Sequence, residues 1–544
     1  MRIRTKHAAV ALIAAIGLGT AWATPPAVAA TNPPGALANG AFEQAVTSAH
    51  PIPGWVVSGD RAAAAVVAGG RSGRAVQLGS GSRHDVTVSQ RVTGLADGYY
   101  TVSLHAHTVG QDAAYLFATG AAAGPQARTA LPVLAAWTAV VVRGVRVVGG
   151  SLTVGVRVAG AAGAKSVLDD VTIARSGGAY TFLAGGDLSQ LNLVQDSGGV
   201  FRDAAGRAAD PVRTMADAGV DIVRLRLYNG TGPGHPRIGH PTDYLPAGYG
   251  DLADNLKLAR RAAAYGMKIQ LTLHYSDYWS NGSIQDLPKD WRYVQSLPAA
   301  QAVTELTRLV HDYTRDVLRA FAAQGTPVDY VSLGNEMQGG LLFPYGNNGG
   351  STRPNLYAFL KAGYAGAKQA SSRIQVVVHL DDAGNYSKYR SFFGALRSNA
   401  VPFDVIGASY YPYWTKKDVA TVLPFFDTIA TEFSTKILVM ETGVNWNPVT
   451  SYGQPGQLPD NGPAGYPQTP AGQRDFLYEL FAGLKSVPDG KVIGDLYWDP
   501  VMIPAPGVGW EVGGANVVEN TTLFDFSGRP LPALDAYRFN VDPG

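Results

Sequence analysis

Two glutamates stand where a charged side chain is unexpected, each at the end of an apolar run. Glu336 ends the run that starts at Val331, and Glu441 ends the run that starts at Ile437. A charge is costly in such surroundings unless the strand has just emerged into a site. Two facing carboxyl groups, one protonated and one ionised, are what the cleavage of a glycosidic bond requires. For either glutamate alone, the alternative is a salt bridge at the rim of the fold.

The elements that must bring these glutamates together form a repeating pattern from Ala179 onward. Eight strand-like runs are present: 180–187, 221–228, 267–275, 328–336, 374–381, 403–411, 437–441 and 492–499. Helical stretches such as 251–265 and 299–323 lie between them, with apolar residues at i, i+3 and i+4. This alternation predicts an α/β fold, a (β/α)8 TIM barrel over residues 179–544. A doubly wound open sheet is the alternative, but no glycine-rich phosphate fingerprint follows the first strand.

Polar and aromatic residues follow the other predicted strands as well. In such a barrel the chemistry lies at the C-terminal ends of the strands. The residues at these ends are Asp187, Arg224, Arg226, His274, Asp277, Trp279, His379, Asp381, Asp382, Tyr410, Tyr411, Trp414, Trp498 and Asp499. They suit a sugar cleft, because hydroxyls take hydrogen bonds and aromatic faces stack on the sugar ring. For His274 and His379 the alternative is a hydrolytic metal site.

Residues 31–175 follow a different pattern, which predicts an all-β sandwich. Short runs such as 85–89, 99–104 and 151–156 alternate in polarity and are separated by glycine-rich turns. The opening motifs 39–43 and 54–55 and the closing motif 168–173 resemble carbohydrate-binding jelly-roll modules. The aromatic residues that could stack on a sugar are Trp55, Tyr99, Tyr100 and Trp137. Core packing is the alternative for each of them.

The first residues predict export. Arg2, Arg4 and Lys6 precede an apolar run that ends near Ala23, and a small-x-small cleavage pattern closes at Ala29. Residues 1–29 therefore have the three parts of a secretory signal peptide. An uncleaved membrane anchor is the alternative, although the apolar run is short for a span. We expect a secreted, extracellular protein with no membrane association after cleavage.

Composition excludes several classes of function. The 544 residues are 46% hydrophobic and 16% charged, which excludes a disordered chain. The net charge of +2 lacks the basic footprint of a nucleic-acid-binding protein, so no nucleic-acid partner is expected. The chain has no cysteine, which excludes disulfides, thiol catalysis and cysteine-ligated metals.

The motifs at the strand ends occur together in an order that resembles glycoside hydrolase family 53. They are the segments 186–189, 223–229, 273–279, 333–344, 379–382, 410–414, 439–442, 497–500 and 519–528. The family comprises endo-β-1,4-galactanases of the retaining barrel clan that uses two glutamates. The resemblance implies a polysaccharide substrate, galactan or arabinogalactan from pectin side chains, and a double-displacement mechanism.

The resemblance also implies roles for individual residues. Glu336 is the acid/base that acts as proton donor, Glu441 is the nucleophile, and Asn335 holds the 2-hydroxyl of the cleaved sugar. Arg226 would lie near Glu441 and keep it ionised. The other expected substrate-binding residues are Asp187, His274, Asp277, Trp279, Asp381, Tyr410, Tyr411, Trp414 and Trp498. Retention predicts carboxyl groups roughly 5–5.5 Å apart in opposed environments, with the pKa of Glu336 raised.

The resemblance implies no cofactor for the chemistry and a monomer. It also suggests a structural calcium ion in the loop after the seventh strand, where Asn445, Asn447, Asp460 and Asn461 offer oxygen ligands. The same residues are ordinary loop formers. Tyr228, Phe343 and Asp499 differ from the residues common in the family, which leaves the fine specificity open. The alternatives are a retaining β-glucanase, mannanase or xylanase of the same clan, and a non-catalytic polysaccharide-binding protein.

Overall fold

The computed structural model of the chain describes residues 35–542 apart from 48–50, 121–125, 237–239 and 241. The predicted signal peptide, residues 1–29, lies outside the described residues. None of the described helices is long and apolar enough to cross a membrane. Strand β8 ends at Ser176 and strand β9 begins at Leu183, so the change from sandwich to barrel falls between them.

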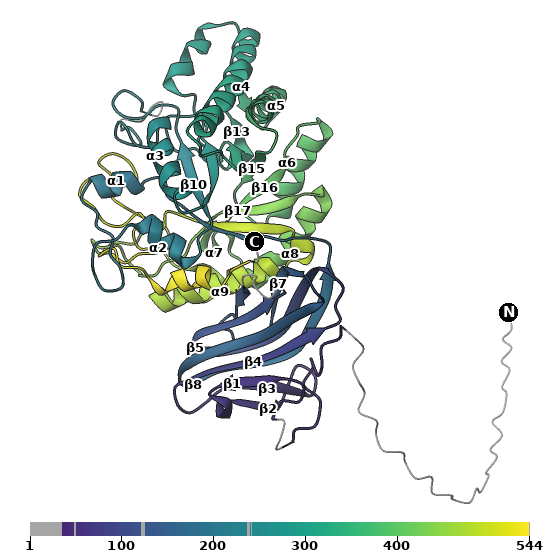
Figure 1. Ribbon diagram of the computed structural model, residues 1–544. Helices are drawn as coiled ribbons and strands as arrows, with labels where there is room; N and C mark the ends of the chain where they lie inside the picture. Colours follow the sequence, from purple (N-terminus) through teal and green to yellow (C-terminus); the bar gives the residue numbers. More distant parts are fainter. Residues whose placement is uncertain (1–34, 48–50, 121–125, 237–239, 241, 543–544) are drawn as a thin grey trace, which may run out of the picture. The chain divides into compact units, whose positions relative to one another are not determined.

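The C-terminal part is a closed barrel of eight parallel strands, as the sequence predicts (Figure 1). The strands are β9 (Leu183–Asp187), β10 (Ile222–Leu227), β11 (Lys268–Leu273), β12 (Tyr330–Leu333), β15 (Gln375–Leu380), β16 (Val405–Tyr410), β17 (Lys436–Thr442) and β18 (Val492–Tyr497). Every predicted run overlaps one of these strands. A short hairpin, β13 (Gly340–Leu341) with β14 (Gly346–Asn347), follows β12.

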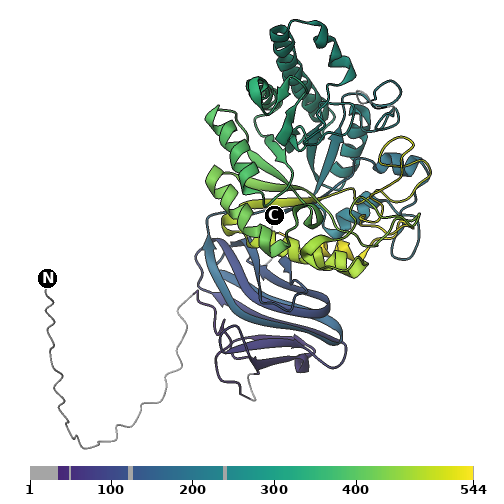
Figure 2. The same cartoon turned by 180° about the vertical axis from the view of Figure 1, so that it is seen from behind.

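Helices surround the barrel strands, as Figure 1 and the reverse view of Figure 2 both show. They are α1 (Leu191–Asp196), α2 (Pro211–Ala218), α3 (Leu252–Ala263), α4 (Ala299–Ala323), α5 (Arg353–Ala370), α6 (Tyr386–Ser398), α7 (Pro412–Thr415), α8 (Val419–Phe433), α9 (Pro470–Ser486) and α10 (Asp535–Arg538). Helix α4 has the predicted bounds. Helix α3 begins after Asp251, whose side chain accepts a hydrogen bond from the Asp254 amide and so satisfies a free donor of the first turn.

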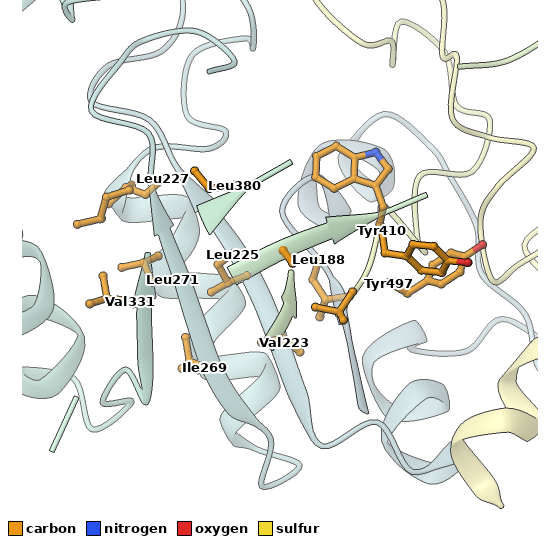
Figure 3. Close-up of a cluster of buried hydrophobic side chains, with 14 of the residues drawn as sticks. Leu188, Val223, Leu225, Leu227, Ile269, Leu271, Val331, Leu380, Tyr410 and Tyr497 are labelled. Atoms are coloured by element: carbon orange, nitrogen blue, oxygen red, sulfur yellow. The ribbon is translucent and has the colours of Figure 1, made fainter. Parts of the chain in front are cut away.

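Strand β10 shows how one strand serves both the core and the site. Its residues alternate between faces. Val223, Leu225 and Leu227 belong to the large apolar core (Figure 3). Arg224 and Arg226, on the other face, are fully buried at 0% exposure. Charged groups at this depth require partners, so their ion pairs define the polar end of the barrel interior.

The N-terminal part is an antiparallel sandwich, also as predicted. Its strands are β1 (Val56–Gly59), β2 (Ala64–Ala68), β3 (Arg74–Gly79), β4 (His84–Thr93), β5 (Gly98–Thr119), β6 (Ala127–Ala130), β7 (Thr138–Val147) and β8 (Ser151–Ser176). They pair in the order β1-β4-β8-β3-β2, and β5 joins β8 to β6 and β7. Alternate residues of β4 are buried, which gives the sandwich an apolar core of its own.

Two of the four aromatic residues proposed to stack on sugar belong to this core. Trp55 packs on Phe42, and its indole N–H donates to the Asn39 carbonyl. Tyr100 is 5% exposed and its hydroxyl donates to a backbone carbonyl. A role in sugar stacking is therefore wrong for both, because their rings are packed in the apolar core and present no free face. Tyr99 and Trp137 are half-buried.

Candidate active site

Glu336 lies at the barrel mouth in a strained backbone conformation. Strand β12 ends at Leu333, and Glu336 has φ 44° and ψ 54°, the left-handed region. This conformation costs a non-glycine residue on the order of 1–3 kcal/mol and persists where the surroundings enforce it. Tyr275, Asp382 and Asp499 also have positive φ just after their strands. The strained turns therefore gather at the ends of the strands where catalytic groups are expected.

A β-bulge positions the second glutamate. The pairing of β16 with β17 shifts register between Ala408 and Ser409, so that Ser409 pairs with Glu441. Bulges of this kind redirect side chains and are common beside active sites. Both side chains line the cleft, and the Ser409 hydroxyl lies 2.7 Å from Oε1 of Glu336.

A cleft of about 430 Å³ opens at these strand ends. It is lined by Trp279, Asn281, Glu336, Asp381, Asp382, Lys388, Ser409, Tyr411, Trp414, Thr415, Glu441, Gln457, Trp498 and Trp510. The ring centre of Trp279 lies 5.1 Å from that of Trp498 and 5.7 Å from that of Trp510. Trp414 is 53% exposed. Carboxyl groups beside such an aromatic wall can bind and cleave a sugar chain.

The two glutamates face each other in this cleft. One carboxyl oxygen of Glu336 and one of Glu441 lie within 4.8 Å of each other. Burial, the Glu441 charge and Asp381 raise the pKa of Glu336 well above its usual range, which favours the protonated form. Burial also raises the pKa of Glu441, while the Arg224 guanidinium opposes that rise. The two environments differ as expected in that the pKa of Glu336 is raised well above its usual range, while contact with Arg224 limits the rise at Glu441.

Arg224 is the arginine that contacts Glu441, whereas Arg226 lowers the pKa of Glu441 through its charge, without a hydrogen bond to it. Nη1 of Arg224 donates to Oε1 of Glu441 over 2.8 Å. Arg226 instead pairs with Asp499 at 2.5 Å and Asp187 at 3.4 Å. The reason is the strand order: Asp187 ends β9 and Asp499 follows β18, and both carboxylates lie beside the end of β10 that contains Arg226.

Six expected substrate-binding residues do not line the cleft: Asn335, Asp187, Arg226, His274, Asp277 and Tyr410. Their hydrogen bonds hold the lining residues and loops instead. Asp277 accepts from the Gly230 and Lys289 amides, and the Tyr410 hydroxyl donates to the Lys417 carbonyl. The His274 ring stacks on Tyr228 and also lies 5.0 Å from the ring of Trp279. These residues hold the cleft-lining side chains and loops in position without lining the cleft themselves.

Comparisons with known proteins agree with this geometry. Residues 183–537 match the model of glycosyl hydrolase family 53. The chain belongs to this family. It is 27% identical to an endo-β-1,4-galactanase of Bacillus subtilis (strain 168), covering 66% of this chain and 86% of that protein. It is 31% identical to a probable arabinogalactan endo-β-1,4-galactanase A of Aspergillus terreus, covering 60% and 87% respectively.

A solved structure supports the same assignment. The family 53 catalytic domain of Ignisphaera aggregans is 31% identical to this chain, with a TM-score of 0.60. The match covers 66% of this chain and 96% of that domain. The protein is therefore a glycoside hydrolase built on the family 53 barrel.

Sequence reasoning missed several residues that line the family 53 cleft. Ser409 lies two residues before Tyr411 and so shares its strand face, a signal that alternation could have supplied. Trp510 and Gln457 come from long segments without periodic pattern, and no local signal marks them. Lys388 lies on α6 and pairs with Asp381 at 2.5 Å, a contact that depends on tertiary packing.

The expected metal alternative takes a different form in the structure. Among the described residues, the histidine–carboxylate cluster compact enough for a metal is Glu336, His379 and Glu441, without His274. The Arg224 guanidinium donates to one of these carboxylates, and a positive charge there disfavours a second cation. The cluster is better suited to carboxylate catalysis.

The loop after β17 uses its polar side chains to fold. The backbone amide of Asn445 donates to the side-chain oxygen of Asn461 over 2.6 Å. The side-chain amide of Asn461 donates to the Asn445 carbonyl over 3.0 Å. Asp460 accepts from the Gly462 amide, and the Asn447 side chain donates to the Val449 carbonyl. These bonds close the loop on itself. A calcium ion at these residues stays a prediction, and no catalytic step depends on it.

Proposed function

We propose that this family 53 hydrolase is a secreted, monomeric endo-β-1,4-galactanase. Its substrates are galactan and arabinogalactan, such as the side chains of pectin, and it cleaves them with retention of configuration. The named relatives support the substrate, and the signal-peptide pattern in residues 1–29 supports secretion. The site supports action as a monomer, because both carboxyl groups and the aromatic wall come from one chain.

The spacing of the carboxyl groups is the observation that carries the mechanism. Their oxygens lie within 4.8 Å, which is close to the retaining separation of roughly 5–5.5 Å. Inverting enzymes need roughly 6.5–9.5 Å to admit a water molecule between the carboxylate and the sugar. The separation therefore favours direct attack by Glu441.

In the first half of the reaction, the protonated Glu336 gives its proton to the leaving glycosidic oxygen. Glu441 attacks the anomeric carbon and forms a glycosyl–enzyme ester. The 2.8 Å bond from Arg224 and the 3.2 Å bond from the Tyr411 hydroxyl orient the two oxygens of Glu441. The attacking carboxylate is thus held in place before the substrate arrives.

In the second half, a water molecule replaces the leaving group. The ionised Glu336 removes a proton from this water, and the resulting hydroxyl attacks the anomeric carbon. The ester bond to Glu441 breaks, and the product leaves with its original configuration. Glu336 ends the cycle protonated, as its surroundings favour.

The first experiment is release of reducing ends from potato galactan, arabinogalactan, cellulose, mannan and xylan, with NMR detection of the newly formed anomer. We expect activity on the galactans and a β-anomer as first product. An α-anomer would overturn the retaining mechanism, and faster release from cellulose, mannan or xylan would favour the clan alternatives. No turnover on any polymer would favour a non-catalytic binding protein.

We also propose that the sandwich serves as a carbohydrate-binding module. Trp137 is half-buried, with its ring 4.8 Å from the His107 ring and at 90° to it. His105 lies two residues along the same strand, 3.4 Å from Arg71, which pairs with Asp170. An aromatic ring beside polar groups on an open sheet face is the pattern that binds sugars.

A further inference from the structure

A chain of buried hydrogen bonds runs beneath Glu336. The Ser409 hydroxyl lies 2.7 Å from Oε1 of Glu336 and 2.8 Å from Nε2 of His379. Nδ1 of His379 lies 3.1 Å from Oδ1 of Asn335. Ser409 is 2% exposed, and His379 and Asn335 are 0% exposed. His379 and Asn335 are closed off from bulk water and Ser409 reaches the cleft only at its edge, so these groups satisfy one another's hydrogen-bonding needs.

The orientation of Asn335 follows from its two other partners. Its Oδ1 accepts from Nη2 of Arg224 over 2.8 Å, and an arginine can only donate. Its Nδ2 donates to the Ser280 carbonyl over 2.8 Å, and a carbonyl can only accept. The oxygen therefore faces His379, and Nδ1 of His379 must carry the hydrogen in this contact.

His379 is held neutral. Burial, together with the Arg224 charge, lowers the pKa of this histidine well below its usual range. With its hydrogen on Nδ1, a neutral imidazole presents a bare Nε2 to Ser409, and this nitrogen can only accept. Ser409 has one hydroxyl hydrogen. When Glu336 is ionised, that hydrogen faces two acceptors and can serve one.

We propose that Ser409 is a hydroxyl rotor, positioned by His379, that follows the protonation state of Glu336. The proposal rests on the proposed function, in which Glu336 is the acid/base. While Glu336 is protonated, it donates to Ser409 and the Ser409 hydroxyl donates to His379. While Glu336 is ionised, the hydroxyl turns to Oε1 of Glu336 and leaves Nε2 of His379 without a donor. Both residues act through Glu336 as positioning residues.

The rotor keeps the proton balance of the reaction unchanged. As substrate binds, the acid hydrogen of Glu336 turns from Ser409 to the leaving oxygen and is transferred to it, and the Ser409 hydrogen then turns from His379 to the new carboxylate. When Glu336 takes a proton from the attacking water, the Ser409 hydrogen returns to His379. Ser409 keeps its hydrogen throughout, and His379 stays neutral. The acid form thus has one more hydrogen bond than the ionised form, which favours protonated Glu336 at rest.

Other groups also act on Glu336 and must be held constant in a test. The charged and titratable groups that face it, or act through a neighbour that does, are Glu441, Asp381, Arg224, Tyr411, Tyr389, Asp382 and Lys388. None of them is changed by substituting His379 with an apolar residue. Because His379 is neutral, its replacement by phenylalanine removes an acceptor without removing a charge.

The test is a double-mutant cycle read on the alkaline limb of kcat/KM against pH, which reports the acid/base of the free enzyme. His379→Phe removes the bond that only the acid form retains, so the limb should move to lower pH. We expect a shift of roughly half to one pH unit. In a Ser409→Ala background, the same substitution should give no shift, because no hydroxyl then connects the two residues.

Three controls keep the outcome interpretable. Ser332→Ala removes another buried barrel hydroxyl, which donates to the Gly334 carbonyl, and should leave the limb in place. Ser409→Thr retains the hydroxyl and should restore the His379→Phe shift. Circular dichroism and thermal unfolding verify folding, and His379→Leu removes the same acceptor if the phenylalanine variant folds poorly.

Equal shifts in the two backgrounds, or no shift in either, would overturn the rotor. Such a result would leave His379 as a general structural or electrostatic element. Failure of the proposed function has a different signature. In that case Glu336→Gln would retain both activity and the alkaline limb, and this result would overturn the rotor together with the acid/base role of Glu336.

Discussion

Arg224 couples the nucleophile to the residues beneath it. It donates to Glu441 and Asn335 at once, from two nitrogens of one planar group. Lysine cannot supply this fork. We therefore expect Arg224→Lys to lower kcat/KM on galactan by about a hundredfold, as for loss of roughly 3 kcal/mol.

The same variant should move the acidic limb of the kcat/KM profile to higher pH. Arg224 favours the ionised form of Glu441, so weakening the contact raises the pKa of that carboxyl further. Arg226→Lys is the matched control, since Arg226 lies two residues along β10 and contacts Asp187 and Asp499. A larger loss in the Arg226 variant would favour the role for Arg226 that the sequence suggested.

Trp414 is the exposed ring of the cleft, 53% accessible and packed edge-on against Tyr413. A sugar stacked on this ring would lose about 1 kcal/mol of binding on truncation, so Trp414→Ala should raise KM roughly fivefold. The value of kcat and the melting temperature should change little. Tyr265→Ala is a control, since Tyr265 is 41% exposed and does not line the cleft. Unchanged KM in Trp414→Ala would remove this ring from the binding site.

At the scale of the strand, β18 contains a carboxyl group without a partner. Both oxygens of Asp495 are buried and lack hydrogen bonds. Burial raises the pKa of Asp495 well above its usual range, so the folded state binds this proton more tightly than the unfolded chain. The contribution to stability is therefore greatest at low pH and falls as pH rises above about 4.

Asp495→Asn should flatten this dependence. The melting temperature of the variant, measured by calorimetry, should increase relative to that of the wild type as pH rises from about 4 to about 8. Asp112→Asn, an exposed position on β5, is the control and should follow the wild-type curve. A parallel curve for Asp495→Asn would show that the carboxyl has acquired a partner or a charge-stabilising water.

The loop after β17 offers a test of the calcium prediction. Its asparagines are joined to each other and to the loop backbone by hydrogen bonds. A calcium ion bound there would stabilise the folded state further, so its removal with EDTA should lower the melting temperature. A loss of stability that calcium restores, and magnesium does not, would establish the ion.

At the scale of the whole molecule, the proposed binding surface of the sandwich should act on polymers alone. Trp137→Ala should weaken retention on insoluble galactan about fivefold while leaving hydrolysis of a short soluble oligosaccharide unchanged. Tyr265→Ala, which removes an exposed ring outside the sandwich, is the control. An equal effect of both substitutions, or of neither, would reject Trp137 as the stacking ring.

Local patterns along the chain were enough to predict the architecture and to place the two glutamates at strand ends. Strand and helix periodicity are local properties, so the barrel strands, the limits of α4 and the sandwich could be predicted from neighbouring residues. The site residues could be predicted where they lie at strand ends, because the parallel strands of a barrel bring those ends together. Seven of the expected site residues line the cleft for this reason: Glu336, Glu441, Trp279, Asp381, Tyr411, Trp414 and Trp498.

The partners of these residues could not be read from the sequence, because they are set by packing between distant segments. The choice of Arg224 over Arg226 for Glu441 depends on the alignment of strands more than 200 residues apart in sequence. The Ser409 contact depends on a bulge in β16–β17 pairing, and the hydrogen on His379 depends on the orientation of Asn335. These are contacts at a distance in sequence, governed by register and side-chain packing. A linear pattern places a residue on a face, whereas its hydrogen-bond partner is chosen by what the fold brings opposite to it.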